Sequence, residues 1–354
     1  MRNLKESWNL FVFLINFSSA QKVERIYNGK DSNGYVFLAS IIEENNVISC
    51  GGSLISDDLV LTAAHCVITG KIAKNTGSAD SSFFNLDIQQ TPLWDVSRNR
   101  SYPVAFGLSS SKTLENALVR FVSDAYCHSD YAPLSDTFRN DICLLRLSTP
   151  ILPEDVSSLI QVKHVCSSKE KCQKNLCLPR SAQEEPPSEC VVAGFGYTEE
   201  YINSNPPQLQ ETVVKYYSHE TCSKWHKDFN LFEGEHFCYG MKDGSSDNCE
   251  GDSGGPLICP SSKEGTLVQV GGIVSFGKRG ICERSPEENK KSPGVYTNVA
   301  KYLSWIQSIE PEIDLSCASE RNYYALSSSA FSISFQIIAN QSFFILMLLL
   351  VFLE

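Results

Sequence analysis

The sequence is short of basic residues relative to acidic ones. Lysine and arginine together number 30 against 41 aspartates and glutamates, which gives a net charge of −11 at pH 7. Nucleic-acid binding usually needs concentrated positive charge, so this balance argues against a nucleic-acid partner. The chain also lacks repeated C-x-x-C pairs, which disfavours structural zinc, and it has no convincing set of oxygen ligands for calcium. We therefore expect neither a metal nor another cofactor.

The 14 cysteines are accordingly interpreted as disulfide partners. An even number of cysteines spread over 354 residues is typical of a chain that folds in an oxidising compartment. The N-terminus supports export, because Arg2 and Lys5 precede an apolar stretch at 10–17 and small residues at 18–20. This pattern predicts a signal peptide over residues 1–20. A buried N-terminal helix is the weaker alternative, since the apolar stretch is short.

The C-terminus lacks an uninterrupted apolar run of the roughly 20 residues that a membrane span needs. Residues 331–353 are apolar but include Gln336, Asn340 and Gln341, and no basic residue follows them. Small residues at 327–330, a spacer and an apolar terminus are typical of a GPI-anchor signal. We favour GPI anchoring, with a retained membrane span and a plain secreted form as alternatives. The expected location is the cell surface or the extracellular space.

Three short motifs carry residues suited to nucleophilic catalysis. Residues 248–256 read NCEGDSGGP and place Ser253 alone in a glycine-rich turn. Such a turn can hold a hydroxyl outward and aim backbone N–H groups at one point beside it. An ordinary glycine turn explains this motif equally well when it is taken alone. Two upstream motifs change the balance: LTAAHC at 61–66 contains His65, and NDICLL at 140–145 contains Asp141.

These motifs, in the order His65, Asp141, Ser253, resemble those of the chymotrypsin/trypsin-like serine peptidases. The resemblance extends from about residue 26 to residue 309 and implies an all-β fold, with two packed six-stranded antiparallel β-barrels and a short C-terminal helix. It implies that Ser253 is the nucleophile, His65 the general base, and Asp141 the group that orients the imidazole. The N–H groups of Gly251 and Ser253 would form the oxyanion hole.

Local patterns agree with a barrel fold, because short strand-like runs alternate with turn residues and show no helical period. The expected strands and closing helix lie at 35–42, 47–55, 59–62, 117–126, 142–147, 190–196, 272–277, 293–299 and 302–309. Residues 70–116, rich in Ser, Asn and Asp, are interpreted as extended surface loops. The expected domains are a signal peptide (1–20), propeptide (21–25), peptidase domain (26–312), Ser-rich stem (313–330) and hydrophobic tail (331–354). The peptidase domain divides into a first barrel (26–150), a connector (151–189) and a second barrel (190–300).

The resemblance also implies four disulfides: Cys50–Cys66, Cys190–Cys259, Cys222–Cys238 and Cys249–Cys282. The remaining six cysteines allow 15 connectivities. The suggested pairs are Cys127–Cys143, at the two sides of an expected strand pair, Cys166–Cys172, which would close a small loop, and Cys177–Cys317. These pairings stay open. Asn99 begins the one N-glycosylation sequon in the body of the chain, and its use is also open.

Arg25 and Ile26 resemble the family's activation site. Cleavage after Arg25 would free the ammonium of Ile26, which the resemblance pairs with the carboxylate of Asp252. A buried ion pair is costly when one partner is missing, so the uncut chain would keep a poorly formed oxyanion turn. A solvated turn is the alternative interpretation. Because Arg25 suits the specificity expected below, the activating protease is either another trypsin-like enzyme or this enzyme itself.

Asp247 lies six residues before Ser253, where the resemblance places the floor of the primary specificity pocket. An aspartate there selects Arg or Lys before the scissile bond, because a buried carboxylate needs a cationic partner. Ser275, Gly277 and Gly294 would line the pocket. A solvated loop acid is the alternative.

We therefore expect a secreted or cell-surface serine endopeptidase, made as a zymogen, that cleaves proteins or peptides after Arg or Lys. Protein protease inhibitors are expected partners, and so is a membrane through the tail. The alternative is a catalytically silent binding module on the same fold, although no triad or oxyanion residue has been lost. An α/β-fold esterase is disfavoured, because it would present its triad in the order Ser, Asp, His.

Overall fold

The computed structural model describes residues 30–43, 47–68, 103–115, 117–132, 138–159, 162–168, 171–198, 201, 204–244, 247–261, 268–277, 292–315 and 323–324. Several predictions fall outside these residues: the signal peptide, the propeptide with Arg25 and Ile26, the sequon at Asn99, Cys282, Cys317 and the tail at 331–354. Within the described part of the chain, no helix is both long and apolar enough to cross a membrane.

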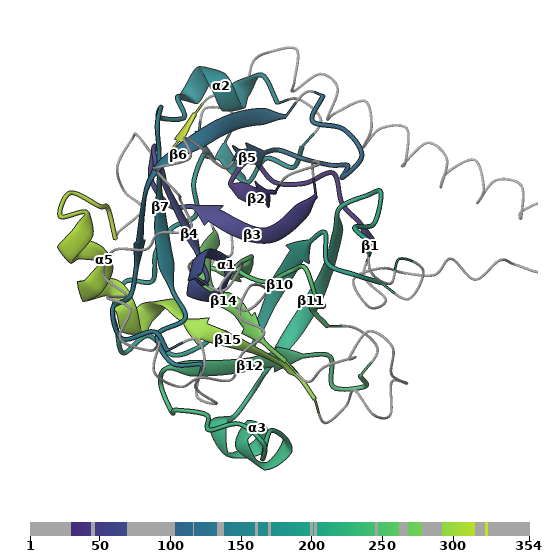
Figure 1. Cartoon of the computed structure of the whole chain (residues 1–354), viewed down its shortest axis with the longest axis vertical. Coiled ribbons are helices and arrows are strands. Elements are labelled where there is room, and N and C mark those ends of the chain that lie inside the picture. The colour runs from purple at the N-terminus through teal and green to yellow at the C-terminus, as the bar shows by residue number, and fades with distance from the viewer. Residues whose placement is uncertain are drawn as a thin grey trace, which may run out of the picture.

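Six antiparallel strands close the first barrel (Figure 1). They are β2 (Leu38–Ile42), β3 (Ile48–Leu54), β4 (Leu59–Thr62), β5 (Pro103–Phe106), β6 (Leu118–Cys127) and β7 (Cys143–Leu147), in the order β2-β3-β4-β7-β6-β5. β2 pairs with both β3 and β5, which closes the ring. The short helix α1 (Ala64–Ile68) follows β4 and lies between the two barrels in Figure 1.

The strand β5 corrects the prediction that 70–116 forms surface loops throughout. Its four residues pair with β2 and β6 in the barrel wall. Val104, Ala105 and Phe106 are all buried, so the strand lacks the alternation of apolar and polar residues by which strands are found in a sequence. In the sequence, the apolar signal of a four-residue strand is hidden by the many polar residues on both sides of it.

The second barrel is also closed by six antiparallel strands. They are β10 (Glu189–Gly194), β11 (Gln210–Tyr217), β12 (His236–Gly240), β13 (Pro256–Pro260), β14 (Val268–Phe276) and β15 (Gly294–Asn298). Their order is β11-β10-β13-β14-β15-β12, and β11 pairs with β12 to close the ring. A 3₁₀ turn (Val299–Tyr302) leads into the helix α5 (Leu303–Ile309). The predicted pair of barrels with a short C-terminal helix is therefore confirmed.

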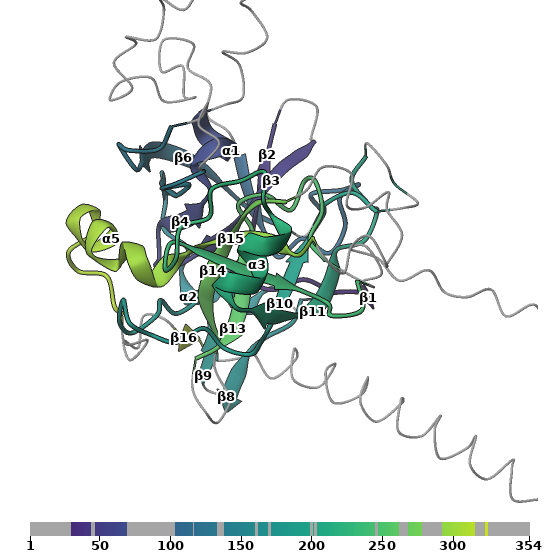
Figure 2. The ribbon, with the colours of Figure 1, turned by 90° about the horizontal axis from the view of Figure 1, so that it is seen from below.

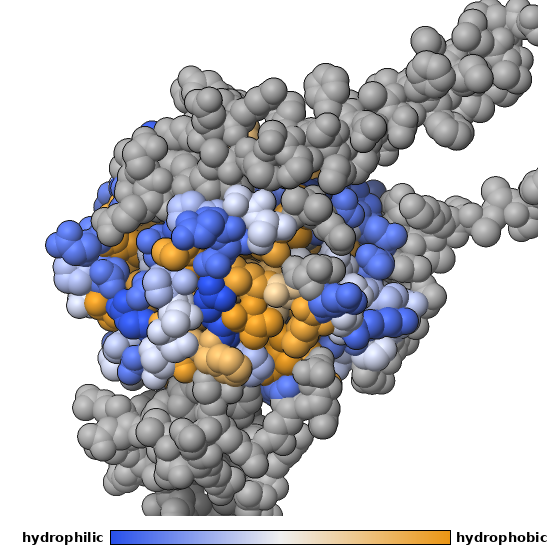
Figure 3. Space-filling view, turned by 90° about the horizontal axis from the view of Figure 1, so that it is seen from above, coloured by the Kyte–Doolittle hydropathy of each residue, from blue (hydrophilic) through white to orange (hydrophobic). Residues whose placement is uncertain are grey.

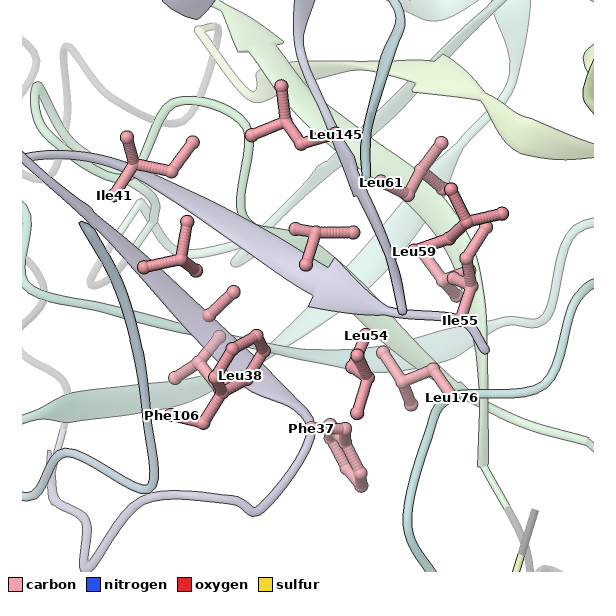
Figure 4. Packing of buried hydrophobic residues seen from close by; sticks show 14 of the residues in the cluster. Phe37, Leu38, Ile41, Leu54, Ile55, Leu59, Leu61, Phe106, Leu145 and Leu176 are labelled. Carbon is pink, nitrogen blue, oxygen red and sulfur yellow. The ribbon is translucent and has the colours of Figure 1, made fainter. Parts of the chain in front are cut away.

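Apolar side chains fill the first barrel and the space where it meets the second. Figure 4 shows Phe37, Leu54, Leu61 and Phe106 among the side chains of this cluster, and all four are buried. Some apolar surface remains outside: β6 and the helix α2 (Pro153–Ser157) lie at the top of Figure 1, and Figure 3 shows a hydrophobic area framed by hydrophilic residues on the face seen from above. Much of a folded protein's accessible surface is apolar, so this area needs no special explanation.

The connector between the barrels is more ordered than its proline-rich sequence predicts. It contains α2 and a hairpin of β8 (Cys166–Ser168) and β9 (Lys171–Gln173). The two-residue strand β16 (Tyr323–Tyr324), from the predicted stem, pairs with β9. Residues 323–324 of the predicted stem therefore pair with the connector. In Figure 2 this small sheet lies on the side of the molecule away from α1.

A buried lysine joins the connector to the first barrel. Lys174 is fully buried, and its ammonium donates to Asp57 Oδ1 at 2.6 Å and to the carbonyl of Ile151 at 3.0 Å. The neighbouring Gln173 exchanges two hydrogen bonds with the backbone of Val268 in the second barrel, at 2.9 and 2.7 Å. These bonds explain how a polar segment can lie between two apolar cores, because every buried polar group needs a partner.

Five disulfides join pairs of described cysteines. They are Cys50–Cys66, Cys127–Cys143, Cys166–Cys172, Cys190–Cys259 and Cys222–Cys238. Cys177 and Cys249 are also disulfide-bonded, and their suggested partners Cys317 and Cys282 lie outside the described residues. No described cysteine is a free thiol.

Replacing Asp57 by alanine should destabilise the protein by about 3 kcal/mol, because it leaves the Lys174 ammonium buried without its counter-charge. The double variant Asp57→Ala/Lys174→Met should recover most of this loss, since both charges are then absent. Guanidinium unfolding with the disulfides intact measures both. Equal losses in the single and double variants would contradict this account.

Candidate active site

His65 lies at the start of α1, in the space between the two barrels (Figure 1). The disulfide between Cys66 and Cys50 ties the next residue to β3 of the first barrel. Ala63 and Ala64 are fully buried on the other side of the turn. The small residues before His65 therefore let the turn pack closely, and the disulfide restricts where the imidazole can lie.

Asp141 is fully buried and directed at His65. Its Oδ2 lies 2.8 Å from His65 Nδ1, and its Oδ1 accepts the backbone N–H of His65 at 2.9 Å. Two groups of the second barrel complete the contacts: the Ser275 hydroxyl donates to Oδ2 at 2.5 Å, and the Thr297 hydroxyl donates to the Asp141 carbonyl at 3.1 Å. The family resemblance places Ser275 in the pocket lining, but its contact with Asp141 and that of Thr297 could not be predicted, because they form only when distant strands meet.

Each of these two ionisable groups shifts the pKa of the other so that the charged form is favoured. Burial opposes protonation of His65, but the charge of Asp141 and its hydrogen bond outweigh burial and raise the pKa of the imidazole above its ordinary 6.5. Burial likewise opposes ionisation of Asp141, yet the charge of His65 and the hydrogen bonds from His65 and Ser275 lower the pKa of its carboxyl. An ionised carboxylate only accepts hydrogen bonds, so His65 Nδ1 must donate, and in the neutral imidazole Nε2 is then left as the acceptor.

The turn that carries Ser253 packs against the His65 region. Gly51 N donates to the Ser253 carbonyl at 2.7 Å, and Gly254 N donates to the Val274 carbonyl at 2.8 Å. Gly254 has a φ of +77°, and a side chain there would meet Thr62 and the sulfur of Cys66. Only glycine allows this approach. Ser253 itself is partly exposed.

The same turn presents two amide groups that have no internal acceptor. Within the described part of the chain, neither Gly251 N nor Ser253 N donates a hydrogen bond, whereas Asp252 N and Gly255 N donate within the turn. Gly251 has a φ of +98°, a conformation that only glycine adopts readily. Two free backbone donors beside a partly exposed serine are suited to binding an oxyanion.

Asp252 points away from this surface into the space between the barrels. Its oxygens accept from Gly196 N and Cys249 N, both at 2.8 Å, and burial raises the pKa of its carboxyl to about 6. Among the described residues, no lysine or arginine pairs with it. A small cavity beside it is lined mainly by apolar residues, including Ile48, Ala193 and Phe195. Ile26, the predicted partner, lies outside the described residues.

Asp247 is a second buried carboxylate whose hydrogen bonds come from the backbone. Its oxygens accept from Asn248 N at 2.8 Å and from Gly294 N at 2.9 Å, and burial raises the pKa of its carboxyl well above the ordinary value. A side chain on Gly294 would collide with Asn248, whereas a Cβ on Gly277 would meet no atom of the described residues within 4 Å. In the described part of the chain, no cationic side chain pairs with Asp247.

Aromatic side chains from both barrels gather beside this site. Phe138 stacks on Phe276 with ring centroids 4.5 Å apart, and Phe229 lies 5.2 Å from Phe276. By analogy with the family, the sequence suggests Phe138 as an apolar neighbour of the pocket, but it does not indicate Phe229 and Phe276 as its partners, because the three rings come from segments far apart in the chain. Together they offer an apolar surface next to Ser275.

Two groups of His and Cys ligand atoms are close enough to suggest a metal site. They are Cys50, His65 and Cys66, and Cys222, His226 and Cys238. In both groups the two cysteines are joined in a disulfide, so no thiolate is available as a ligand. Neither group fits a metal ion.

Comparison with known proteins identifies the family. Residues 26–91 and 94–306 match the Trypsin family, and the chain therefore belongs to it. A human protein named "Transmembrane protease serine 5" is 30% identical over 259 residues, which are 73% of this chain and 45% of that protein. The chain thus spans less than half the length of this curated relative.

Raising the pH from 4 to 7 should cost the uncut protein about 2 kcal/mol of stability relative to its Asp252→Asn variant. The folded-state pKa of Asp252 is raised to about 6, so folding favours the protonated carboxyl, and this stabilisation is lost as the pH rises through about 6. Urea unfolding of both proteins across this range measures the difference. Parallel stability curves would show that the carboxylate is not held unpaired.

Proposed function

We propose that this chain is a serine endopeptidase in which His65, Asp141 and Ser253 act together. The observation that carries the proposal is the His65–Asp141 pair. A buried carboxylate accepts from the imidazole Nδ1 at 2.8 Å and from the backbone N–H of His65 at 2.9 Å, which leaves Nε2 of the neutral imidazole as the acceptor. The turn of Ser253 packs against the same region, as its bond to Gly51 shows. These groups lie 76 residues apart or more in the sequence, so local structure does not explain their meeting.

The proposed reaction uses these groups in sequence. His65 Nε2 takes the Ser253 Oγ proton as Oγ attacks the scissile carbonyl carbon, and the N–H groups of Gly251 and Ser253 stabilise the oxyanion. The C–N bond then breaks, and His65 gives its proton to the leaving amine. Water, deprotonated by His65, releases the acyl group and regenerates Ser253. Asp141 stays ionised throughout and stabilises the imidazolium.

The proposed specificity is for Arg or Lys before the scissile bond. Asp247 supports it, because its buried carboxylate receives only backbone N–H bonds and pairs with no cation in the described part of the chain. A substrate guanidinium or ammonium would supply the missing charge. Gly277 has no described neighbour within 4 Å of its Cβ position, which agrees with room for a long side chain. Gly294 keeps the pocket floor free of a Cβ, and Ser275 links the pocket wall to Asp141.

The proposed form is a zymogen that enters the secretory pathway and reaches the cell surface or extracellular space. Cleavage after Arg25 would free the Ile26 ammonium to pair with Asp252, whose buried carboxylate lacks a cation among the described residues. The tail at 331–354 would serve as a GPI signal or a membrane span, and the human relative is named a transmembrane protease. The same proposal includes glycosylation of Asn99, a disulfide between Cys249 and Cys282, and binding of protein protease inhibitors.

The protein cut after Arg25 should hydrolyse peptide amides with Arg or Lys before the scissile bond and leave matched Phe and Ala peptides intact. Ser253→Ala should lower kcat by at least about 10⁴-fold, because the nucleophile is removed. Initial rates on the four peptides measure both effects. A correctly cut, disulfide-intact protein that cleaves none of them, and that is not labelled by a fluorophosphonate, would favour the silent binding module.

Asp247→Asn should reduce kcat/KM for Arg and Lys peptides by about a hundredfold or more, because it removes one partner of a desolvated charge pair. The exposed loop residue Asp243 provides the control: Asp243→Asn should change these values less than about twofold. Steady-state kinetics on the same peptides measure the difference. Equal effects of the two substitutions would place the specificity pocket elsewhere.

A further inference from the structure

The backbone that leads into Asp141 takes an unfavourable path. Phe138 has a φ of +45° and Asn140 a φ of +58°, and among the described residues they alone combine a side chain with a positive φ. This conformation is tolerated by asparagine but is an outlier for a bulky residue such as phenylalanine. Such residues persist only where the surrounding structure holds them in place.

Arg139, which lies between Phe138 and Asn140, forms a bidentate ion pair. Arg139 Nε donates to Glu235 Oε2 at 2.7 Å, and Arg139 Nη2 donates to Glu235 Oε1 at 2.5 Å. The guanidinium also lies 4.2 Å from the centre of the Phe232 ring. The Glu235 side chain is 13% exposed and that of Arg139 is 42% exposed. Glu235 directly precedes β12, and Phe232 lies three residues earlier. The contacts of Arg139 with both residues therefore link the first-barrel segment to the second barrel.

The flanking residues are held from the same side. His236 Nε2 donates to the Phe138 carbonyl at 3.3 Å, because its Nδ1 accepts from Phe232 N at 3.1 Å. The Tyr302 hydroxyl donates to Asn140 Oδ1 at 3.2 Å. Each residue of the run 138–140 thus has a partner beyond the first barrel, as Asp141 has in Ser275 and Thr297.

We propose that Arg139 and Glu235 are positioning residues for the reaction: their ion pair holds the run 138–140 so that the Asp141 carboxylate faces His65. The proposal rests on the function proposed above, because it assigns Asp141 its role there. Asp141 belongs to the first barrel, but the orientation of its carboxylate is then set by an ion pair with the second barrel. Arg139 and Glu235 touch neither substrate nor reacting atoms.

A positioning role differs from a structural role in what it changes. Arg139 is 42% exposed and stays solvated without its partner, so the loss of Glu235 should barely alter the melting temperature. A small displacement of the Asp141 carboxylate, by contrast, weakens its hold on the imidazole and slows the chemical step. The distinguishing sign is the pKa of His65, which the Asp141 charge raises. When the carboxylate moves away, this pKa falls.

The acid limb of a pH–activity profile can be assigned to His65 once the other titratable groups that face Asp141 are considered. They are His65, His236, Tyr131 and Tyr302. Burial raises the pKa of both tyrosines far above neutrality and lowers that of His236, which already donates to Phe138 in its neutral form. The acid limb of activity near neutral pH therefore follows His65.

The test compares Arg139→Ala and Glu235→Ala in the full chain cut after Arg25. Each should lower kcat on an Arg-amide peptide by about tenfold while KM changes less than about twofold. The acid limb of kcat/KM should move down by about half a pH unit, since a weaker Asp141 contact makes His65 easier to deprotonate. The double variant should be no worse than either single one, because both remove the same contact.

Arg146→Ala is the matched control. Arg146 also pairs with two carboxylates, Asp58 and Glu310, at 2.8 Å each, and it lies in β7 only five residues beyond Asp141. Its loss should leave kcat and the acid limb unchanged. The proposal is overturned if the Arg139 and Glu235 variants behave like Arg146→Ala, or if their loss of kcat comes with a lower melting temperature and an unmoved acid limb.

A second measurement separates this proposal from the function on which it rests. Proton NMR of His65 in the Ser253→Ala background reports the imidazole pKa without any catalysis. A lower His65 pKa in Arg139→Ala supports the positioning role even if the parent protein cleaves no peptide, in which case the proposed function alone fails. An unchanged His65 pKa, in a protein whose parent does cleave Arg peptides, rejects the positioning role alone.

Discussion

The arrangement of the molecule depends on one buried carboxylate. Asp141 is fully buried, and a buried charge is tolerated only when hydrogen bonds and an opposite charge replace water. His65 supplies two of these contacts from the first barrel and the Ser275 hydroxyl supplies one from the second, while the Thr297 hydroxyl donates to the backbone carbonyl of Asp141. The carboxylate is therefore satisfied only when both barrels are folded and docked. Folding and the assembly of the site become the same event.

Two other buried aspartates show the opposite solution. Asp247 and Asp252 receive hydrogen bonds from backbone N–H groups, and no cationic side chain of the described residues pairs with either. Each carboxylate is thus left short of one positive charge. In the proposed mechanism, a substrate side chain supplies the first and the freed N-terminus supplies the second. Substrate binding and activation would then each offset the unfavourable desolvation free energy of one buried carboxylate.

The residues proposed for the site were named from the sequence through the family resemblance, which three short motifs carry. The glycines around Ser253 and the alanines before His65 are needed for close packing, and they are therefore visible without any tertiary information. The contacts of Ser275 with Asp141 and of Arg139 with Glu235 were not predictable. These residues have no local signature, and their roles arise only when distant strands meet. The strand β5 was missed for a related reason, since complete burial removes the alternation that marks a strand.

The sequence by itself determined the class of fold and the chemical groups of the site, because turn residues, barrel-length strands and motif order are local properties of the chain. The tertiary structure decided which hydroxyls bind Asp141, where the connector is buried, and that Phe138 and Asn140 adopt a positive φ. The physical reason is that orientation and charge state depend on every group packed around a side chain. For Asp141 those groups come from both barrels, and only the docked barrels bring them together.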